Sequence, residues 1–244
     1  MPQRYLPRPD AVFGAVSDIH PPLYLHITAT AARVVIGTIA GTIGGVALAL
    51  CITTWDSTRR LIMPAALSLR AIPPIATVPF FLLWFGFSEW GKFLLVATGV
   101  GLNIVVAAIQ ILEQTDEKFL IALTSFNRSL RSNPFVVSLP LIMEGLLPTL
   151  RTSVAIIFGA SLVSELLGSQ LGLGYLIQTS RTTYSMHVVF LVTLILGVLA
   201  TFLDWGVVGV WNLFIFWRRK RAHSKETSAV RRLRSSEARR IRGS

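Results

Sequence analysis

The chain has 244 residues, of which 52% are hydrophobic and only 14% are charged, and its mean hydropathy is +0.62. A soluble domain carries about 25% charged residues, so this composition excludes an ordinary soluble protein and indicates a polytopic membrane protein. The net charge is +11. Most of it lies in residues 218–244, where 11 Lys/Arg oppose 2 Asp/Glu.

Long apolar segments follow one another along the chain. Each is predicted to be a helix, because lipid allows only helices or closed barrels to span it and no alternating strand pattern is present. The sequence therefore predicts an all-α, polytopic membrane helix bundle with about five transmembrane helices. The segments are roughly 27–54, 61–87, 93–112, 141–167 and 187–217.

The segments differ in the residues that interrupt them. The first contains small residues at helical spacing (GTIAGTIGGVALAL), which suit close helix packing in lipid. The second is broken by prolines, and the third has no charge over 20 residues. The fourth carries Glu144, Arg151 and Glu165, and the fifth contains Asp204.

The distribution of Lys and Arg between the connections predicts the orientation, since cytoplasmic loops are richer in these residues. The richer side holds Arg59 and Arg60, the loop 113–135 and the basic end of the chain. We therefore expect an external N-terminal segment at 1–22, a transmembrane domain at 23–217, and a cytoplasmic, disordered tail at 218–244. The tail has no aromatic residue to stack on bases, so nucleic acid is not expected as a partner.

A short amphipathic helix is predicted within the loop 113–135. Phe119, Leu123, Phe126 and Leu130 recur at i, i+4, i+7 and i+11, which places them on one helical face. Pro134 then ends the helix. The pattern leaves three alternatives open: the helix lies in the lipid interface, packs against the bundle, or docks into a groove on a soluble partner.

Ionisable and helix-breaking residues inside the apolar segments are the candidates for a translocation pathway. Glu165 lies in an apolar helix, where function or ion pairing is the default expectation; Arg70 or Arg151 would be its partner in a structural pair. Arg70 stands beside Pro73 and Pro74, whose freed backbone groups are tolerable where they line a cavity. Arg70 could attract an anionic solute, or the prolines could only shape packing.

Three small or polar residues complete the candidate pathway set. Gly159 and Ser161 allow close helix approach or a narrow pore, and Asn103 suits an interhelical hydrogen bond better than a solute contact. Arg151 is expected to reach the cytoplasmic interface. The four histidines have no metal-ligand spacing, and no G-x-x-x-x-G-K-[ST] loop is present to bind ATP.

Several stretches resemble one known family. They are RAIPPIATVPFFLLWFGFSEWGK (70–92), the loop IALTSFNRS…SLP (121–140) and LRTSVAIIFGASLVSELLGSQLGLGYLI (150–177). Together they resemble the permease subunit of binding-protein-dependent ABC importers, within the group that serves nitrate, sulfonates and taurine. The resemblance covers roughly residues 5–217.

The resemblance implies that 119–131 is a coupling helix that docks on an ATPase subunit. By this reading the docking residues are Phe119, Ala122, Leu123, Phe126, Asn127, Arg128 and Leu130. The family glutamate is replaced here by Ile121, the second alanine by Leu123, and the glycine by Asn127, which still tolerates a left-handed turn. The family's first transmembrane helix has no counterpart in this sequence.

The resemblance also implies the partners. They are two ABC ATPase subunits that hold ATP and Mg²⁺, a second permease copy or a homologous permease, an extracytoplasmic solute-binding protein, and the lipid of a bacterial inner membrane. The chain itself is expected to hold no cofactor and to be no enzyme. Two alternatives remain: a proton-coupled secondary transporter that uses Glu165 or Asp204 as a relay, and a non-transporting membrane scaffold.

Overall fold

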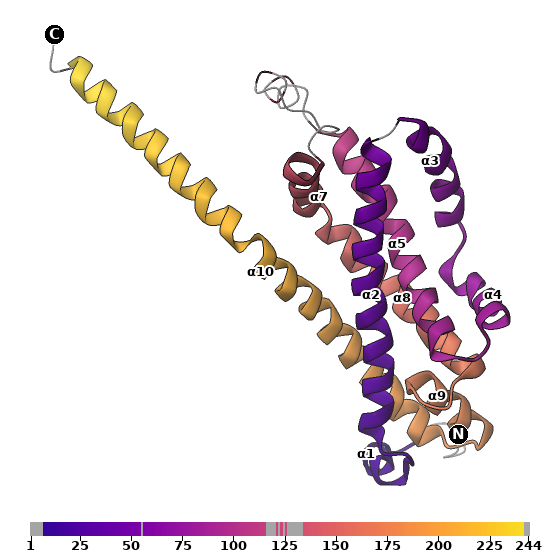
Figure 1. Ribbon diagram of the computed structural model, residues 1–244. Helices are drawn as coiled ribbons and strands as arrows, with labels where there is room; N and C mark the ends of the chain where they lie inside the picture. The colour runs from indigo at the N-terminus through magenta and orange to yellow at the C-terminus, as the bar shows by residue number, and fades with distance from the viewer. Residues whose placement is uncertain are drawn as a thin grey trace.

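The computed structural model describes residues 7–54, 56–115, 121, 123, 125 and 134–241 (Figure 1). This part of the chain is helical and contains no strand, which confirms the all-α prediction. The elements are α1 (Pro9–Gly14), the 3-10 helix η1 (Ala15–Asp18), α2 (Leu23–Thr54), α3 (Asp56–Arg70), α4 (Pro74–Phe85), α5 (Glu89–Glu113), the π-helical turn η2 (Pro134–Ser138), α7 (Leu139–Gly145), α8 (Leu147–Gly168), α9 (Leu173–Thr182) and α10 (Met186–Ile241).

Four stretches are long and apolar enough to cross a bilayer, and a bent pair supplies a fifth. The four are α2, α5, α8 and Met186–Leu213 of α10. The fifth joins Ile62–Arg70 to Pro74–Phe85 across a bend of 103°. About five spans were predicted; the described residues supply four, or five when the bent pair counts as one span.

The bend between α3 and α4 follows from the prolines. The last turn of α3 closes when the Ala71 N–H donates to the Leu67 carbonyl at 3.2 Å. Pro73 has no N–H to continue this ladder, and a residue before proline avoids the helical region. A new helix begins at Pro74, a position where proline is favoured because its missing donor would be unpaired anyway.

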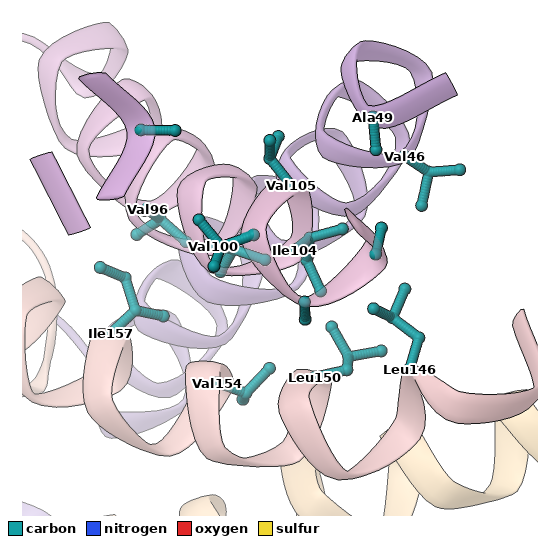
Figure 2. Close-up of a cluster of buried hydrophobic side chains, with 14 of the residues drawn as sticks. Val46, Ala49, Val96, Val100, Ile104, Val105, Leu146, Leu150, Val154 and Ile157 are labelled. Atoms are coloured by element: carbon teal, nitrogen blue, oxygen red, sulfur yellow. The ribbon is translucent and has the colours of Figure 1, made fainter. Parts of the chain in front are cut away.

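The core of the bundle lies between α2, α5 and α8. Figure 2 shows Val46 and Ala49 of α2 facing Val100 and Ile104 of α5, with valine, leucine and isoleucine side chains of α8 closing the third side. Glycines let α2 and α5 approach closely: a Cβ on Gly41 would lie 2.4 Å from the Ala97 carbonyl oxygen. This close approach is typical of helix pairs in lipid.

One end of the bundle gathers α1, the turn between α4 and α5, and α9 (bottom of Figure 1). We call it the outer end, because the distribution of Lys and Arg predicts that it faces away from the cytoplasm. A second apolar cluster holds it together, formed by Val12, Ala15, Ile19, Leu173, Leu176, Val188, Leu191 and Val192. The short α1 and η1 thereby pack against α10 and the start of α9.

The helix α10 continues beyond the last span to Ile241. The backbone of residues 218–241 is therefore helical, where the composition predicted a disordered tail. Alanine, arginine, lysine and glutamate are good helix formers, so continuation from an existing span is inexpensive.

Candidate functional site

Four charged side chains meet at the outer end, which we call the outer-end cluster (Arg33, Glu89, Lys92 and Glu165). Arg33 Nη1 donates to Glu165 Oε1 at 2.7 Å, while Arg33 Nη2 donates to Glu89 Oε1 at 2.9 Å. Lys92 Nζ contacts the same Glu89 oxygen at 3.0 Å. Arg33, Lys92 and Glu165 are buried, and Glu89 is exposed. Two positive and two negative groups thus balance in a cluster of which only Glu89 is exposed.

Glu165 also caps the N-terminus of α9. Its Oε2 accepts hydrogen bonds from the Gly174 N–H and from Thr30 Oγ1, both at 2.9 Å. The Leu173 N–H donates to Thr30 Oγ1 at 2.9 Å, and the Gly172 N–H donates to Nδ1 of His26 at 3.1 Å. Side chains of α2 and α8 therefore satisfy the backbone donors that a helix start leaves free.

The two glycines of the sequence Gly172-Leu173-Gly174 are required by this capping. Gly172 has a φ of +134°, which side-chain-bearing residues rarely adopt, and a Cβ there would lie 2.4 Å from Glu165 Oε2. A Cβ on Gly174 would lie 2.5 Å from the Leu162 carbonyl oxygen. Glu165 and the two glycines, which carry part of the family resemblance, thus form one structural unit.

The partner predicted for Glu165 was wrong. Arg33 holds Glu165, and neither Arg70 nor Arg151 contacts it. Contacts across 132 residues do not follow from local spacing, so Arg33 was not predicted as the partner. A usable signal was present, because an arginine inside an apolar segment needs an acidic partner or a cavity.

The remaining pathway candidates do not gather at one site. Arg70, at the end of α3, and Pro73 are exposed beside the bend, and Pro74 is half-buried. Asn103 is half-buried in α5. Gly159 of α8 faces open space, and the buried Ser161 Oγ finds no hydrogen-bond partner among the described residues. Their roles in a pathway stay predictions.

A second ion pair joins α8 to α10. Arg151 Nε donates to Asp204 Oδ1 at 2.7 Å, and Arg151 Nη2 donates to Asp204 Oδ2 at 2.6 Å. The side chains are 49% and 36% exposed. Arg151 was predicted to reach the cytoplasmic interface; its guanidinium instead forms this bidentate pair, a geometry that fixes both partners.

Most of the predicted coupling residues lie outside the described part of the chain. These are Phe119, Ala122, Phe126, Asn127, Arg128 and Leu130. The described neighbours Ile121, Leu123 and Ser125 have helical backbone, and Ser125 Oγ donates to the Ile121 carbonyl at 3.1 Å. The docking surface itself therefore stays a prediction.

Comparisons with known proteins agree with the fold and the motifs. The profile of the family described as "Binding-protein-dependent transport system inner membrane component" matches residues 41–209. A formylaminopyrimidine transport permease protein of Halalkalibacterium halodurans is 26% identical over 88% of this chain and 86% of that protein. A taurine transport system permease protein of Escherichia coli is 22% identical over 84% and 75% of the two chains.

A further relative and one solved structure complete the comparison. A putative aliphatic sulfonates transport permease protein of Bacillus subtilis is 26% identical over 80% of this chain and 71% of that protein. A chain of the inward-facing MetNI methionine ABC transporter superposes with a TM-score of 0.66 at 16% identity, covering 80% of this chain and 98% of that chain. The family match and the apolar helices make this a multi-pass membrane protein. The chain belongs to the family of binding-protein-dependent transport system inner membrane components, as a permease component of an ABC importer.

Proposed function

We propose that this chain forms the translocation pathway of an ATP-driven importer for a small, polar, anionic solute and sits in a bacterial inner membrane. The observation that carries the proposal is the family match over residues 41–209, within a fold shared with the MetNI transporter. The unit formed by Glu165, Gly172 and Gly174 supports it, since this is one of the segments that carries the resemblance.

The energy comes from two separate ATPase subunits that bind ATP and Mg²⁺. The segment 119–131 docks into them as a coupling helix, with Phe119, Leu123, Phe126 and Leu130 as its apolar face. Closure of the ATPase subunits on ATP moves this helix. The movement shifts the bundle between inward-open and outward-open states.

The other partners follow from the same family. A second copy of this chain, or a homologous permease, completes the pathway, and a solute-binding protein delivers the solute to the outer end. The relatives are named for taurine, aliphatic sulfonates and formylaminopyrimidine. Two of those three names are sulfonates, which favours an anionic solute for this chain.

The secondary-transporter alternative has no comparable support. It rested on Glu165 or Asp204 as a proton relay. Arg33 holds Glu165, and Arg151 holds Asp204 in a bidentate pair. Each carboxylate is thus engaged in an ion pair in this structure, and neither is presented as a free proton relay.

The proposal is tested by a pull-down in mild detergent, with the tagged chain co-expressed with the genes that flank it. We expect the wild type to recover an ATPase subunit and Phe126→Asp to lose it, because a buried charge opposes docking of an apolar face. Phe13→Asp is the matched control, as Phe13 is a 68% exposed phenylalanine at the outer end.

Recovery with the wild type and with Phe13→Asp, but not with Phe126→Asp, supports the ATP-driven importer and the placement of its coupling helix. If the ATPase is recovered with all three chains, the coupling helix is misplaced. If no ATPase accompanies the wild type, the importer function is contradicted.

A further inference from the structure

The Arg151–Asp204 pair lies inside both spans: Arg151 follows the start of its span, Leu147, by four residues, which is about 6 Å along a helix. Asp204 precedes the end of its span, Leu213, by nine residues, which is about 14 Å along a helix. A carboxylate on one methylene cannot bridge that distance. Arg151 could extend further, but both of its hydrogen-bonding arms are committed to Asp204.

The pair nevertheless faces outward from the folded chain, since its side chains are 49% and 36% exposed. Charged groups at this depth face a bundle interior or a water-filled cavity, because exposure to hydrocarbon is expensive. The interior of this bundle is occupied by the α2–α5–α8 core. The exposed sides of the two charges therefore require water or another polar surface.

A stripe of small and polar side chains runs along α8 and α10 from the pair, beside exposed apolar side chains such as Ile156 and Phe202. On α8, Ala155 and Gly159 follow Arg151 at spacings of four residues, and on α10, Gly197 and Thr201 precede Asp204 on the same helical face. Ala155 and Thr201 are exposed, and a Cβ on Gly159 or Gly197 would meet no atom within 4 Å. We call these six residues the α8–α10 face.

The exposed face of α2 at the same depth has the opposite character. Ile36, Ile39 and Ile43 are 55%, 54% and 65% exposed. Because Arg33 contacts Glu165 and the two helices run in opposite directions, Ile43 and Ala155 each lie ten residues inward from that contact. Large branched side chains suit lipid, whereas small side chains leave room next to a charge pair.

We propose that the α8–α10 face lines the inner part of the solute pathway, and that Arg151 there binds the acidic group of a passing solute. Asp204 holds the guanidinium while the pathway is empty. The binding of a solute by Arg151 rests on the proposed function. The exposure of the α8–α10 face to water does not. It places the anion-binding arginine at Arg151 and not at Arg70.

The exposure is tested by thiol labelling in membranes from cells that express the chain with its flanking genes. Cys51, the only cysteine of the sequence, is replaced by serine, and Ala155→Cys and Ile43→Cys are compared as a depth-matched pair. The probe is a membrane-impermeant sulfonate-bearing methanethiosulfonate. The cysteine thiolate attacks it, a mixed disulfide forms, and a sulfinate leaves.

We expect Ala155→Cys to react at least roughly tenfold faster than Ile43→Cys, because a charged cleft concentrates a counter-ion by about that factor or more. We also expect the sulfonate probe to outpace the trimethylammonium probe at position 155. Arg151→Gln should remove that preference, and Arg151→Lys should restore it.

Equal, slow labelling at both positions would overturn the proposal, since the α8–α10 face would then lie against lipid or a second copy. A charge preference that Arg151→Gln leaves unchanged would overturn the role of Arg151. Neither result depends on ATP or on an identified solute. Failure here is therefore distinct from failure of the pull-down, which alone contradicts the importer function.

Discussion

Arg33 connects the two carboxylates of the outer-end cluster. It bonds Glu165 of α8 and Glu89 of α5 at the same time, so three helices depend on one guanidinium. A buried ion pair adds little stability by itself, but removing one partner leaves an uncompensated buried charge. The cluster should therefore be sensitive to single substitutions and tolerant of paired ones.

Arg33→Gln is expected to lower the free energy of unfolding by about 3–5 kcal/mol, because it strands Glu165 in a buried site. The exposed Arg181 of α9 supplies the control Arg181→Gln. The double variant Arg33→Gln with Glu165→Gln should cost less than the sum of its two single variants. Thermal unfolding in detergent measures all of these, and additive effects would mean that the pair is not coupled.

Gly172→Ala is expected to destabilise the outer end, because it combines a disfavoured φ with a Cβ 2.4 Å from Glu165 Oε2. Gly14→Ala is the control, since nothing lies within 4 Å of a Cβ there. The yield of monodisperse protein in detergent and the melting temperature should fall for Gly172→Ala alone. Equal behaviour of the two variants would contradict the capping geometry.

Close approach of α2 and α5 organises the bundle at the scale of elements. Gly37, Gly41 and Gly45 recur every four residues on α2, and a Cβ at each would lie under 3.0 Å from an atom of α5. In lipid, packing and not hydrophobic exclusion holds such helices together. The glycine spacing therefore sets the distance between the two helices.

Gly41→Ala is expected to separate α2 from α5 and to lower the melting temperature. Gly44→Ala is the control. Gly44 lies three residues further along the same helix on its open face, where no atom would contact the new Cβ. Alanine is the better helix former by about 1 kcal/mol, so Gly44→Ala should be neutral or stabilising. Similar losses from both substitutions would show that helix propensity, and not contact, determines the effect.

The sequence predicted the elements better than their contacts. Long apolar runs identify spans directly, and Pro73 with Pro74 identifies the break, since both signals are local. The pairing of Arg33 with Glu165 and of Arg151 with Asp204 depends on which helix faces come into contact in the folded bundle. The cap of α9 likewise depends on His26 and Thr30, which lie more than 130 residues away from Gly172 and Leu173, from whose N–H groups they accept hydrogen bonds.

At the scale of the whole molecule, five spans would place the two ends of the transmembrane domain on opposite sides of the membrane. The crossing by the bent pair α3–α4 decides this, because four spans would return the chain to the same side. The excess of Lys and Arg near one face then predicts that α1 and α9 lie outside and that the loop 113–135 lies inside.

This topology is tested with alkaline phosphatase, which is active only outside the cytoplasm. We expect a fusion after Ser88 to be active and a fusion after Gln114 to be inactive, because α5 crosses the membrane between them. A fusion after Thr54 should be inactive and serves as the reference. An inactive fusion at Ser88 with an active one at Gln114 would mean that α3 and α4 form a re-entrant loop.

The central claim is that this chain converts ATP hydrolysis by partner subunits into solute import. Its most direct test is the ATP hydrolysis rate of the assembled complex in lipid nanodiscs, with and without the solute-binding protein encoded beside it. The account predicts that the binding protein raises the rate and that Phe126→Asp abolishes the assembly that hydrolyses ATP. A complex whose ATP hydrolysis ignores the binding protein, or a chain that assembles with no ATPase at all, would contradict it.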